Sequence, residues 1–229
     1  IEPMNGVGMK RDALFNMIEQ QIRPWDVSQP DVLRAFHDMP RAGFLPASHR
    51  AFAYMDTELP LVIDGVDTHT TLLTPRVLAR IVQAVDLKKT ETAAQVGLGD
   101  GYLTALLAKF AKSVTVFELN ESILYFAQRN LNQHAVRNVN YELSCGLKNG
   151  VDQYDVLVLA GSVTELTNGL KQRIAVGGRL FAIVGFKEAA TMQAVLVTRV
   201  TETSWIQENL FETVAPALAQ AQTHSAFAF

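Results

Sequence analysis

The order of apolar and polar residues predicts strands that alternate with helices over the C-terminal two thirds of the chain. Short apolar or β-branched runs predict strands at residues 93–96, 113–117, 138–143, 155–160, 179–184, 192–200 and 206–215. Helical spacing of apolar residues lies between them, at residues 102–110, 120–131 and 165–174. The run DVLVLA is apolar on both faces, as in a buried parallel strand. We therefore expect an α/β fold with a doubly wound, mostly parallel sheet and right-handed crossovers.

The N-terminal third has a different pattern. Helical spacing predicts one helix over residues 9–23 and another with Ser28 as its N-cap and Pro30 in its first turn. These helices either complete the core or cover a substrate. The apolar stretch 59–63 precedes a segment, residues 64–71, that we interpret as a polar loop lining an active site or an ordinary turn. A third helix is expected to begin at Pro75, with Thr74 as its N-cap.

These patterns divide the chain into four parts. Residues 1–8 are expected to be a disordered or non-native N-terminus, and residues 9–75 a helical extension with a substrate-side loop. Residues 76–218 form the predicted cofactor-binding domain, and residues 219–229 a tail. From Pro216 onward the chain is rich in Ala and Gln and has no clear anchor, which predicts an end that is either frayed or engaged in a contact.

Three alternating glycines mark the candidate site. Gly97, Gly99 and Gly101 lie between a predicted strand and a predicted helix, where backbone N–H groups and the helix dipole favour a ligand's polar groups. Glu118 ends the next strand, where a carboxylate can accept hydrogen bonds from both ribose hydroxyls. The stretch is therefore typical of a site for a nucleoside cofactor.

The glycine spacing favours S-adenosylmethionine (SAM). The dinucleotide motif is G-x-G-x-x-G/A, whereas this chain has G-x-G-x-G followed by Tyr102, which is too large to replace the third glycine. A nicotinamide cofactor and a purely structural turn remain the alternatives. Parallel strands bring their carboxyl ends to one edge, so that edge gathers the predicted cofactor residues. These are Gly97, Leu98, Gly99, Asp100, Gly101, Glu118, Leu119, Cys145, Gly146 and Ala160.

Composition narrows the possible classes of protein. With 229 residues, 48% of them hydrophobic and 19% charged, the chain can form a large packed core. A net charge of −3 gives no basis for a nucleic-acid footprint. A single cysteine excludes an intrachain disulfide and fits a reducing cytoplasm. No apolar run predicts a membrane span, no pattern predicts a metal site, and no oligomeric state follows from the sequence.

Several segments together resemble the protein-L-isoaspartate O-methyltransferase family, from about Met17 to Leu218. They are VLRAFHDMPRAGFLP, AFAYMDTELPL, VGLGDGYLTALLA, VTVFELN, YDVLVLAGSVTEL, LKQRIAVGGRLFAIVG and ENLFETVAPAL. The resemblance implies a SAM-binding sheet of seven strands with an N-terminal helical extension. It also implies methyl transfer to the carboxylate of isoaspartyl residues in damaged proteins, which starts their repair through a succinimide.

The resemblance breaks at the position associated with catalysis. Family members carry Q-T-I-S-x-P before the helix that starts here at Pro75. Thr71 keeps the threonine, but Leu73 takes the place of the serine, and leucine can neither donate nor accept a hydrogen bond. A one-residue shift would offer Thr71 or Thr74 as the hydroxyl, so these two are the predicted catalytic residues.

Three polar positions around the cofactor also depart from the family. Gln95 replaces the acid that helps to hold the cationic methionine portion of SAM, and Asp100, where serine is usual, could restore an acid nearby. Cys145 replaces the aspartate beside the adenine, where a thiol is a poor acceptor, and the sequence favours a small buried residue at this position.

The resemblance and the departures leave three hypotheses. The first is an isoaspartate carboxyl methyltransferase, whose ionised nucleophile requires no base. The second is a SAM methyltransferase on another acceptor, such as a small molecule; an amine or phenol would require a base such as His69 or Asp67. The third is a non-catalytic member of the family that binds the cofactor.

Overall fold

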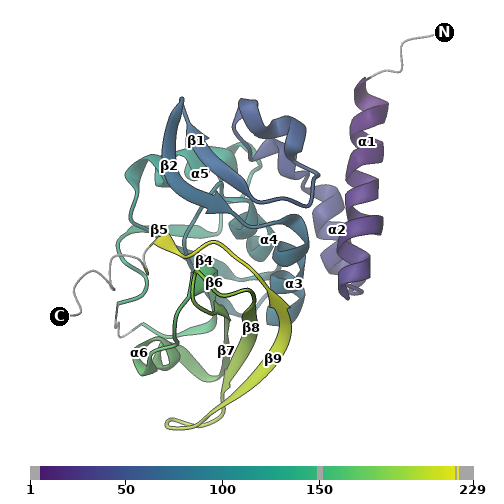
Figure 1. The fold of residues 1–229 in the computed structure, drawn as a ribbon. Helices are drawn as coiled ribbons and strands as arrows, with labels where there is room; N and C mark the ends of the chain where they lie inside the picture. Colours follow the sequence, from purple (N-terminus) through teal and green to yellow (C-terminus); the bar gives the residue numbers. More distant parts are fainter. Residues whose placement is uncertain (1–5, 149–151, 220, 222–229) are drawn as a thin grey trace.

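A seven-stranded sheet forms the centre of the molecule. The computed structural model describes residues 6–148, 152–219 and 221. The strands lie in the order β5-β4-β3-β6-β7-β8-β9; the first five are mutually parallel, and β8 and β9 are antiparallel (Figure 1). Their bounds are β3 Thr92–Val96, β4 Ser113–Glu118, β5 Val139–Leu143, β6 Tyr154–Val163, β7 Ile174–Val184, β8 Met192–Arg199 and β9 Trp205–Thr213. The predicted doubly wound, mostly parallel sheet is therefore confirmed.

The central strands are buried on both faces. On β6, Val156 and Val158 belong to one apolar cluster, whereas Leu157 and Leu159 belong to the other, as the two-residue period of a strand requires. The first cluster contains the apolar faces of α3 (Pro75–Val85), α4 (Tyr102–Phe110) and α5 (Glu121–Gln133). The second includes Leu170 of α6 (Asn168–Gln172). Apolar burial on both faces therefore holds the sheet between two layers.

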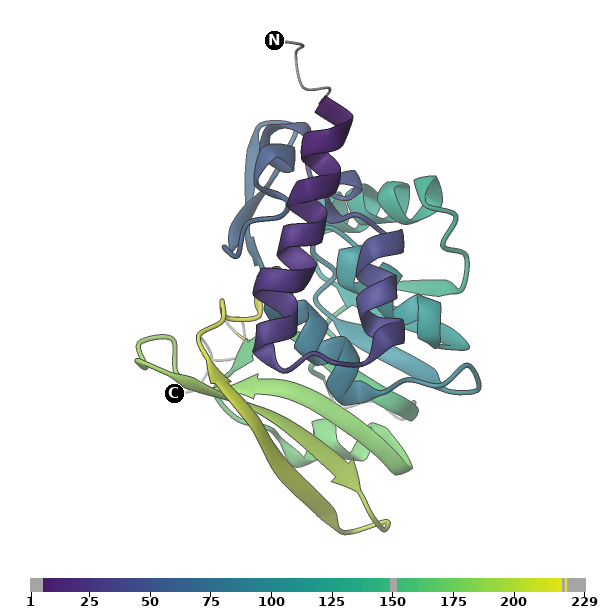
Figure 2. The same cartoon turned by 90° about the vertical axis from the view of Figure 1, so that its right-hand side faces the viewer.

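The N-terminal helices complete the first apolar layer. Helix α1 (Gly6–Asn16) continues as a π-helix, Met17–Ile22, and a short 3-10 turn, and α2 spans Pro30–Asp38. Figure 2 shows both helices running across the side of the molecule that carries α3 and α4. Met17, Ile22 and Phe36 are fully buried. Of the two interpretations of these helices, the structure supports the core role.

The predicted polar loop at residues 64–71 was wrong, because this segment is mostly strand. Strand β1 (Leu59–Ile63) pairs antiparallel with β2 (Val66–Leu72) in a separate hairpin. Its turn consists of Asp64 and Gly65, both with positive φ. The side chains of β2 are mostly polar and partly exposed, so the segment lacks the apolar alternation of a half-buried strand.

Four element boundaries also differ from prediction. Helix α1 already begins at Gly6, inside the segment expected to be disordered, while residues 1–5 lie outside the described residues. The N-cap of α2 is Gln29 and not Ser28, whose backbone N–H donates to Gln83. Helix α6 is shorter than predicted, and β7 starts at Ile174, within the segment expected to be helix and turn.

The first residues of the predicted tail do have an anchor, so of the two expectations for the tail the contact applies to them and fraying does not. The N–H of Ser162 donates to the Pro216 carbonyl at 2.8 Å, and the N–H of Leu218 donates to the Ser162 carbonyl at 2.9 Å. The hydroxyl of Ser162 donates to the carbonyl of Ala215. We call Pro216 to Leu218 the C-terminal strap, because these residues lie against the end of β6. Of the remaining tail, residues 220 and 222–229 lie outside the described residues.

Among the helices that the structure describes, none is long and apolar enough to cross a membrane.

Candidate functional site

A pocket lies at the carboxyl ends of β3, β4 and β6. It encloses about 60 Å³. Six of the predicted cofactor residues line it: Gly97, Leu98, Gly99, Asp100, Glu118 and Ala160. The structure adds the strap, residues 70–73 of the hairpin end, and Arg41. Residues from six parts of the chain therefore meet where the sheet topology predicted a ligand.

The glycine turn has a backbone that other residues adopt only with strain. Gly97, Gly99 and Gly101 have φ of 85°, 56° and 86°, in the left-handed region. Gly101 is the N-cap of α4 and faces Ala127 of α5, where a Cβ would lie 3.2 Å from the alanine Cβ. Gly101 thus allows close packing of α5, although it does not line the pocket. The large Tyr102 is fully buried against Phe44.

Glu118 holds the turn in place. One carboxylate oxygen accepts from the N–H of Leu98 at 3.0 Å, and the other accepts from the N–H groups of Leu119 and Asn120 at 2.8 and 3.0 Å. Glu118 is 5% exposed. Since a carboxylate offers about four acceptor positions, it retains capacity for one further bond at the pocket. We expected Glu118 to accept from both ribose hydroxyls, but its three backbone bonds leave an acceptor position for one of them.

Gln95 supports the same turn from below. Its amide nitrogen donates to the Gly97 carbonyl at 2.8 Å, and its amide oxygen accepts from the Thr104 hydroxyl at 2.9 Å. Gln95 is fully buried. An ionised acid at this position could accept from Thr104 but could not donate to Gly97, so the amide gives up a charge and adds a bond to the turn.

Asp100 brings an acid to the pocket, as the sequence suggested. One of its oxygens accepts from the N–H of Tyr102 at 3.0 Å, which uses an amide expected to face the ligand. Its other oxygen, Oδ2, is buried and has no hydrogen-bond partner among the described residues. Burial raises the pKa of the Asp100 carboxyl, and the positive charge of Arg41 opposes this shift.

Arg41 is the principal residue that sequence reasoning missed. It lies in the 3-10 turn Arg41–Gly43, is 1% exposed, and donates through Nη2 to the Leu73 carbonyl at 3.0 Å. Its Nε and Nη1 have no hydrogen-bond partner in the part of the chain that the structure describes. The M-P-R segment draws attention to this arginine. Nothing in the segment indicates that the Arg41 side chain lies near Asp100, 59 residues further along the chain.

The two predicted catalytic threonines have different environments. Thr71 of β2 lines the pocket, as does Thr70. Thr74 is the N-cap of α3 but makes no capping bond with its side chain, and its buried hydroxyl oxygen has no partner among the described residues. Thr74 does not line the pocket. The structure therefore favours Thr71 as the hydroxyl at the site.

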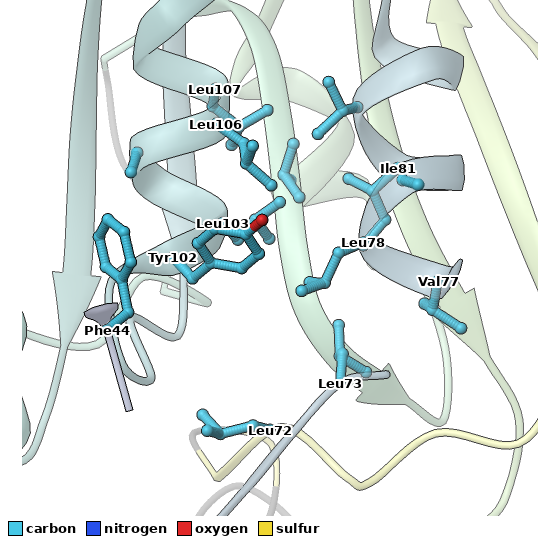
Figure 3. Packing of buried hydrophobic residues seen from close by; sticks show 14 of the residues in the cluster. Phe44, Leu72, Leu73, Val77, Leu78, Ile81, Tyr102, Leu103, Leu106 and Leu107 are labelled. Carbon is cyan, nitrogen blue, oxygen red and sulfur yellow. The ribbon is translucent and has the colours of Figure 1, made fainter. Parts of the chain in front are cut away.

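Leu73 belongs to the apolar core. It is 4% exposed and lies beside Leu78 of α3, at the edge of the cluster that contains Leu103 (Figure 3). Its side chain has no polar group, and Arg41 donates a hydrogen bond to its backbone carbonyl. The loss of the family serine thus coincides with a buried guanidinium at the same place.

Several candidate residues do not reach the pocket. Leu119 is 43% exposed, and neither it nor Cys145 and Gly146 line the pocket. Gly146 packs tightly instead, because a Cβ there would lie 2.7 Å from atoms of Phe117 and Val96. His69 and its neighbour Asp67 line a separate groove between the hairpin and α5, and the His69 side chain is 90% exposed. The structure therefore does not place a histidine base at the pocket.

The chemistry of the pocket fits SAM. Glu118 suits a ribose, and Arg41 and Asp100 offer buried, unpartnered polar atoms. The enclosed space is smaller than the roughly 300 Å³ or more that is usual for a ligand pocket. A Cβ on Gly97 would lie 2.7 Å from Cδ1 of Leu218, and one on Gly99 would lie 3.0 Å from Cδ2 of Leu72. These two flexible side chains lie over the turn, so a nucleoside requires them to rotate.

No metal is indicated at this site or elsewhere in the described part of the chain, where no group of three His, Cys, Asp or Glu residues could hold an ion.

Comparisons with known proteins agree on one family. The family model described as protein-L-isoaspartate(D-aspartate) O-methyltransferase matches residues 12–218. The chain is 30% identical over 196 residues to the protein-L-isoaspartate O-methyltransferase of Rhodopseudomonas palustris strain CGA009, covering 85% of this chain and 87% of that protein. It is 33% identical over 190 residues to protein-L-isoaspartate O-methyltransferase 1 of Rhodopseudomonas palustris strain HaA2, covering 82% of this chain and 74% of that protein.

Two solved structures share the fold. A protein-L-isoaspartate O-methyltransferase has a TM-score of 0.75 at 23% identity, covering 90% of this chain; the chain spans 65% of that protein. A putative protein-L-isoaspartate O-methyltransferase from Plasmodium falciparum, solved with S-adenosyl-L-homocysteine, has a TM-score of 0.72 at 19% identity. The match covers 92% of this chain and 98% of that protein. With the family model spanning nearly the whole chain, these matches show that the chain belongs to the protein-L-isoaspartate(D-aspartate) O-methyltransferase family.

Proposed function

We propose that this protein is a SAM-dependent methyltransferase that methylates the carboxylate of isoaspartyl residues in damaged proteins. The observation that carries the proposal is the meeting of the glycine turn, Glu118 and Thr71 at one pocket. Family membership supports the cofactor and the substrate class. A reducing cytoplasm is the compartment we propose, on the basis of the single cysteine.

The residues at the pocket perform positioning rather than base catalysis. SAM, when bound, supplies an activated methyl group. The acceptor carboxylate is already ionised near neutral pH, since an unperturbed Asp has a pKa of ~3.9. The protein must bring the carboxylate to about 3–3.5 Å from the methyl carbon and exclude water. Thr71 can donate a hydrogen bond to the acceptor, while Leu72 and the strap cover the pocket.

A direct test joins binding with turnover. Calorimetric titration with SAM and S-adenosylhomocysteine should give a saturable heat, and an isoaspartyl peptide should then accept a methyl group that the matched aspartyl peptide does not accept. Absence of both heat and thermal shift at millimolar cofactor would refute the proposal.

A different methyl acceptor is the second candidate, because Leu73 stands where the family has its serine. Leu73→Ser distinguishes the two candidates. If isoaspartyl peptide is the acceptor, the restored hydroxyl should raise its methylation several-fold, since it adds a hydrogen-bond donor at the site. If the wild-type protein and Leu73→Ser both bind the cofactor and neither methylates the isoaspartyl peptide, another acceptor or the non-catalytic role would be favoured.

A further inference from the structure

Two buried groups of opposite charge lie at the same pocket without pairing. Arg41 and Asp100 both line it and are 1% and 6% exposed. No hydrogen bond joins them: Arg41 uses only Nη2, for the Leu73 carbonyl, and Asp100 uses only Oδ1, for the Tyr102 N–H. Arg41 Nε, Arg41 Nη1 and Asp100 Oδ2 are therefore buried polar atoms without partners in the described chain.

Such an arrangement is unfavourable without a ligand. A buried ion is strongly destabilising unless hydrogen bonds and an opposite charge compensate it. Each group feels the charge of the other, since Asp100 opposes the shift that burial causes in the pKa of Arg41. This attraction leaves the donors and the acceptor unsatisfied. A ligand that carries a carboxylate and an ammonium group close together would satisfy both sides.

The places where the two acids contact the turn indicate which part of the cofactor lies beside Arg41 and Asp100. Glu118 contacts the start of the turn, at the Leu98 N–H, whereas Asp100 contacts its end, at the Tyr102 N–H. If the ribose lies at Glu118, the amino-acid end of the same cofactor extends toward Asp100 and Arg41. In this chain Gln95, which replaces the usual acid, hydrogen-bonds to Gly97 and Thr104 through both ends of its amide.

From this geometry we infer that Arg41 and Asp100 together bind the α-amino-acid end of SAM. Arg41 Nε and Nη1 donate to its carboxylate, and Asp100 Oδ2 accepts from its ammonium group. The Asp100 carboxylate takes over the role that the missing acid at position 95 leaves open. This inference rests on the proposed use of SAM. Both are binding residues and take no part in the bond changes at the methyl group.

The test compares two ligands that differ in this end only. S-adenosylhomocysteine carries the amino and carboxylate groups, whereas 5′-methylthioadenosine lacks them. Arg41→Gln and Asp100→Asn should each weaken S-adenosylhomocysteine binding by about 10- to 100-fold, the range for a lost hydrogen bond between charged groups. Binding of 5′-methylthioadenosine should change by less than about 3-fold. Titration calorimetry measures both affinities without turnover.

Matched controls separate a binding role from a folding role. Asp100→Asn keeps an oxygen for the Tyr102 N–H, and so tests the charge if Arg41→Gln fails to fold. Arg199 is also buried, at 4% exposure, but hydrogen-bonds to carbonyls of residues 172, 174, 201 and 202, away from the pocket. Arg199→Gln should lower the melting temperature while leaving the ratio of the two affinities unchanged.

Three outcomes would overturn the inference in different ways. Equal losses for both ligands would mean that the variants disturb the whole pocket. Unchanged S-adenosylhomocysteine affinity, with a raised KM for the isoaspartyl peptide, would assign the Arg41 guanidinium to the acceptor carboxylate. If the wild-type protein binds neither ligand, the proposed function fails together with this inference.

Discussion

Two carboxylates flank the glycine turn, and their hydrogen bonding is very different. Glu118 receives three backbone N–H groups, from Leu98, Leu119 and Asn120. Asp100 receives one, from Tyr102, and leaves an oxygen unpartnered. The first is a structural group that retains some capacity for a ligand, and the second is a buried charge whose environment is incomplete. A group that builds a site and a group that binds within it can thus be told apart by counting their partners.

The largest effect is expected from Glu118→Ala. It leaves three N–H groups without their acceptor and removes the predicted ribose contact, so the free energy of unfolding should fall by about 3 kcal/mol. Affinity for S-adenosylhomocysteine should fall by more than about 100-fold. Denaturant unfolding and calorimetry measure the two effects.

Asp155→Ala is the control for Glu118→Ala. Asp155 accepts from the N–H and the hydroxyl of Thr92, at the opposite end of β3 from the glycine turn. The variant should lose stability and keep its affinity for the ligand. If Glu118→Ala loses stability alone, with affinity preserved, the ribose does not lie at Glu118.

Amide substitutions should separate the two acids further. Glu118→Gln places a donor against backbone donors and should lower the free energy of unfolding by about 2 kcal/mol. Asp100→Asn keeps the oxygen that accepts from the Tyr102 N–H. The variant loses the attraction to Arg41, but a neutral amide costs less to bury than a carboxylate. The free energy of unfolding should therefore change by no more than about 1 kcal/mol. Urea unfolding of both variants checks the difference. Equal losses would show that Asp100 is as structural as Glu118.

These contrasts also show where sequence reasoning reached its limit. The strands, the glycine turn and Glu118 were predictable, because they depend on local periodicity and on the topology of a parallel sheet. Arg41 was not, since its role arises only when the N-terminal 3-10 turn packs beside Asp100. The strap was missed for the same reason, as its anchor is the end of β6 and not a local pattern. The hairpin strand β2 was missed because its side chains are polar.

The ionisation of Asp100 provides a smaller effect with a defined sign. Burial raises the pKa of Asp100 in the folded protein above its ordinary value of 3.8. The folded state therefore holds the proton more tightly than the unfolded state, and this contribution to stability is present at low pH and lost as pH rises through the raised pKa. The stability of Asp100→Asn relative to wild type should accordingly increase from pH 4 upward, as urea unfolding across pH would show. A constant difference between the two proteins would mean that Asp100 ionises normally.

The smallest expected effect on ligand affinity concerns Leu218 of the strap, which lies over Gly97. Two hydrogen bonds through Ser162 anchor the strap backbone and a third holds Ala215 just before it, so Leu218→Ala removes the covering side chain without releasing the segment. The substitution should reduce the free energy of unfolding by about 2 kcal/mol. It should also raise S-adenosylhomocysteine affinity about 3-fold, because less apolar contact must be displaced when the nucleoside enters; this is about 0.6 kcal/mol.

Leu170→Ala is the matched control for Leu218→Ala. Leu170 belongs to the same apolar cluster and is similarly buried, at 3% against 4%, but it does not line the pocket at the glycine turn. It should lose comparable stability with no gain in affinity. If Leu218→Ala instead weakens ligand binding, the leucine contacts the nucleoside after rotating, and the strap is a wall of the occupied site. Either result distinguishes the strap from the turn beneath it, where Gly97 has no side chain to move and the backbone is held in place by Gln95.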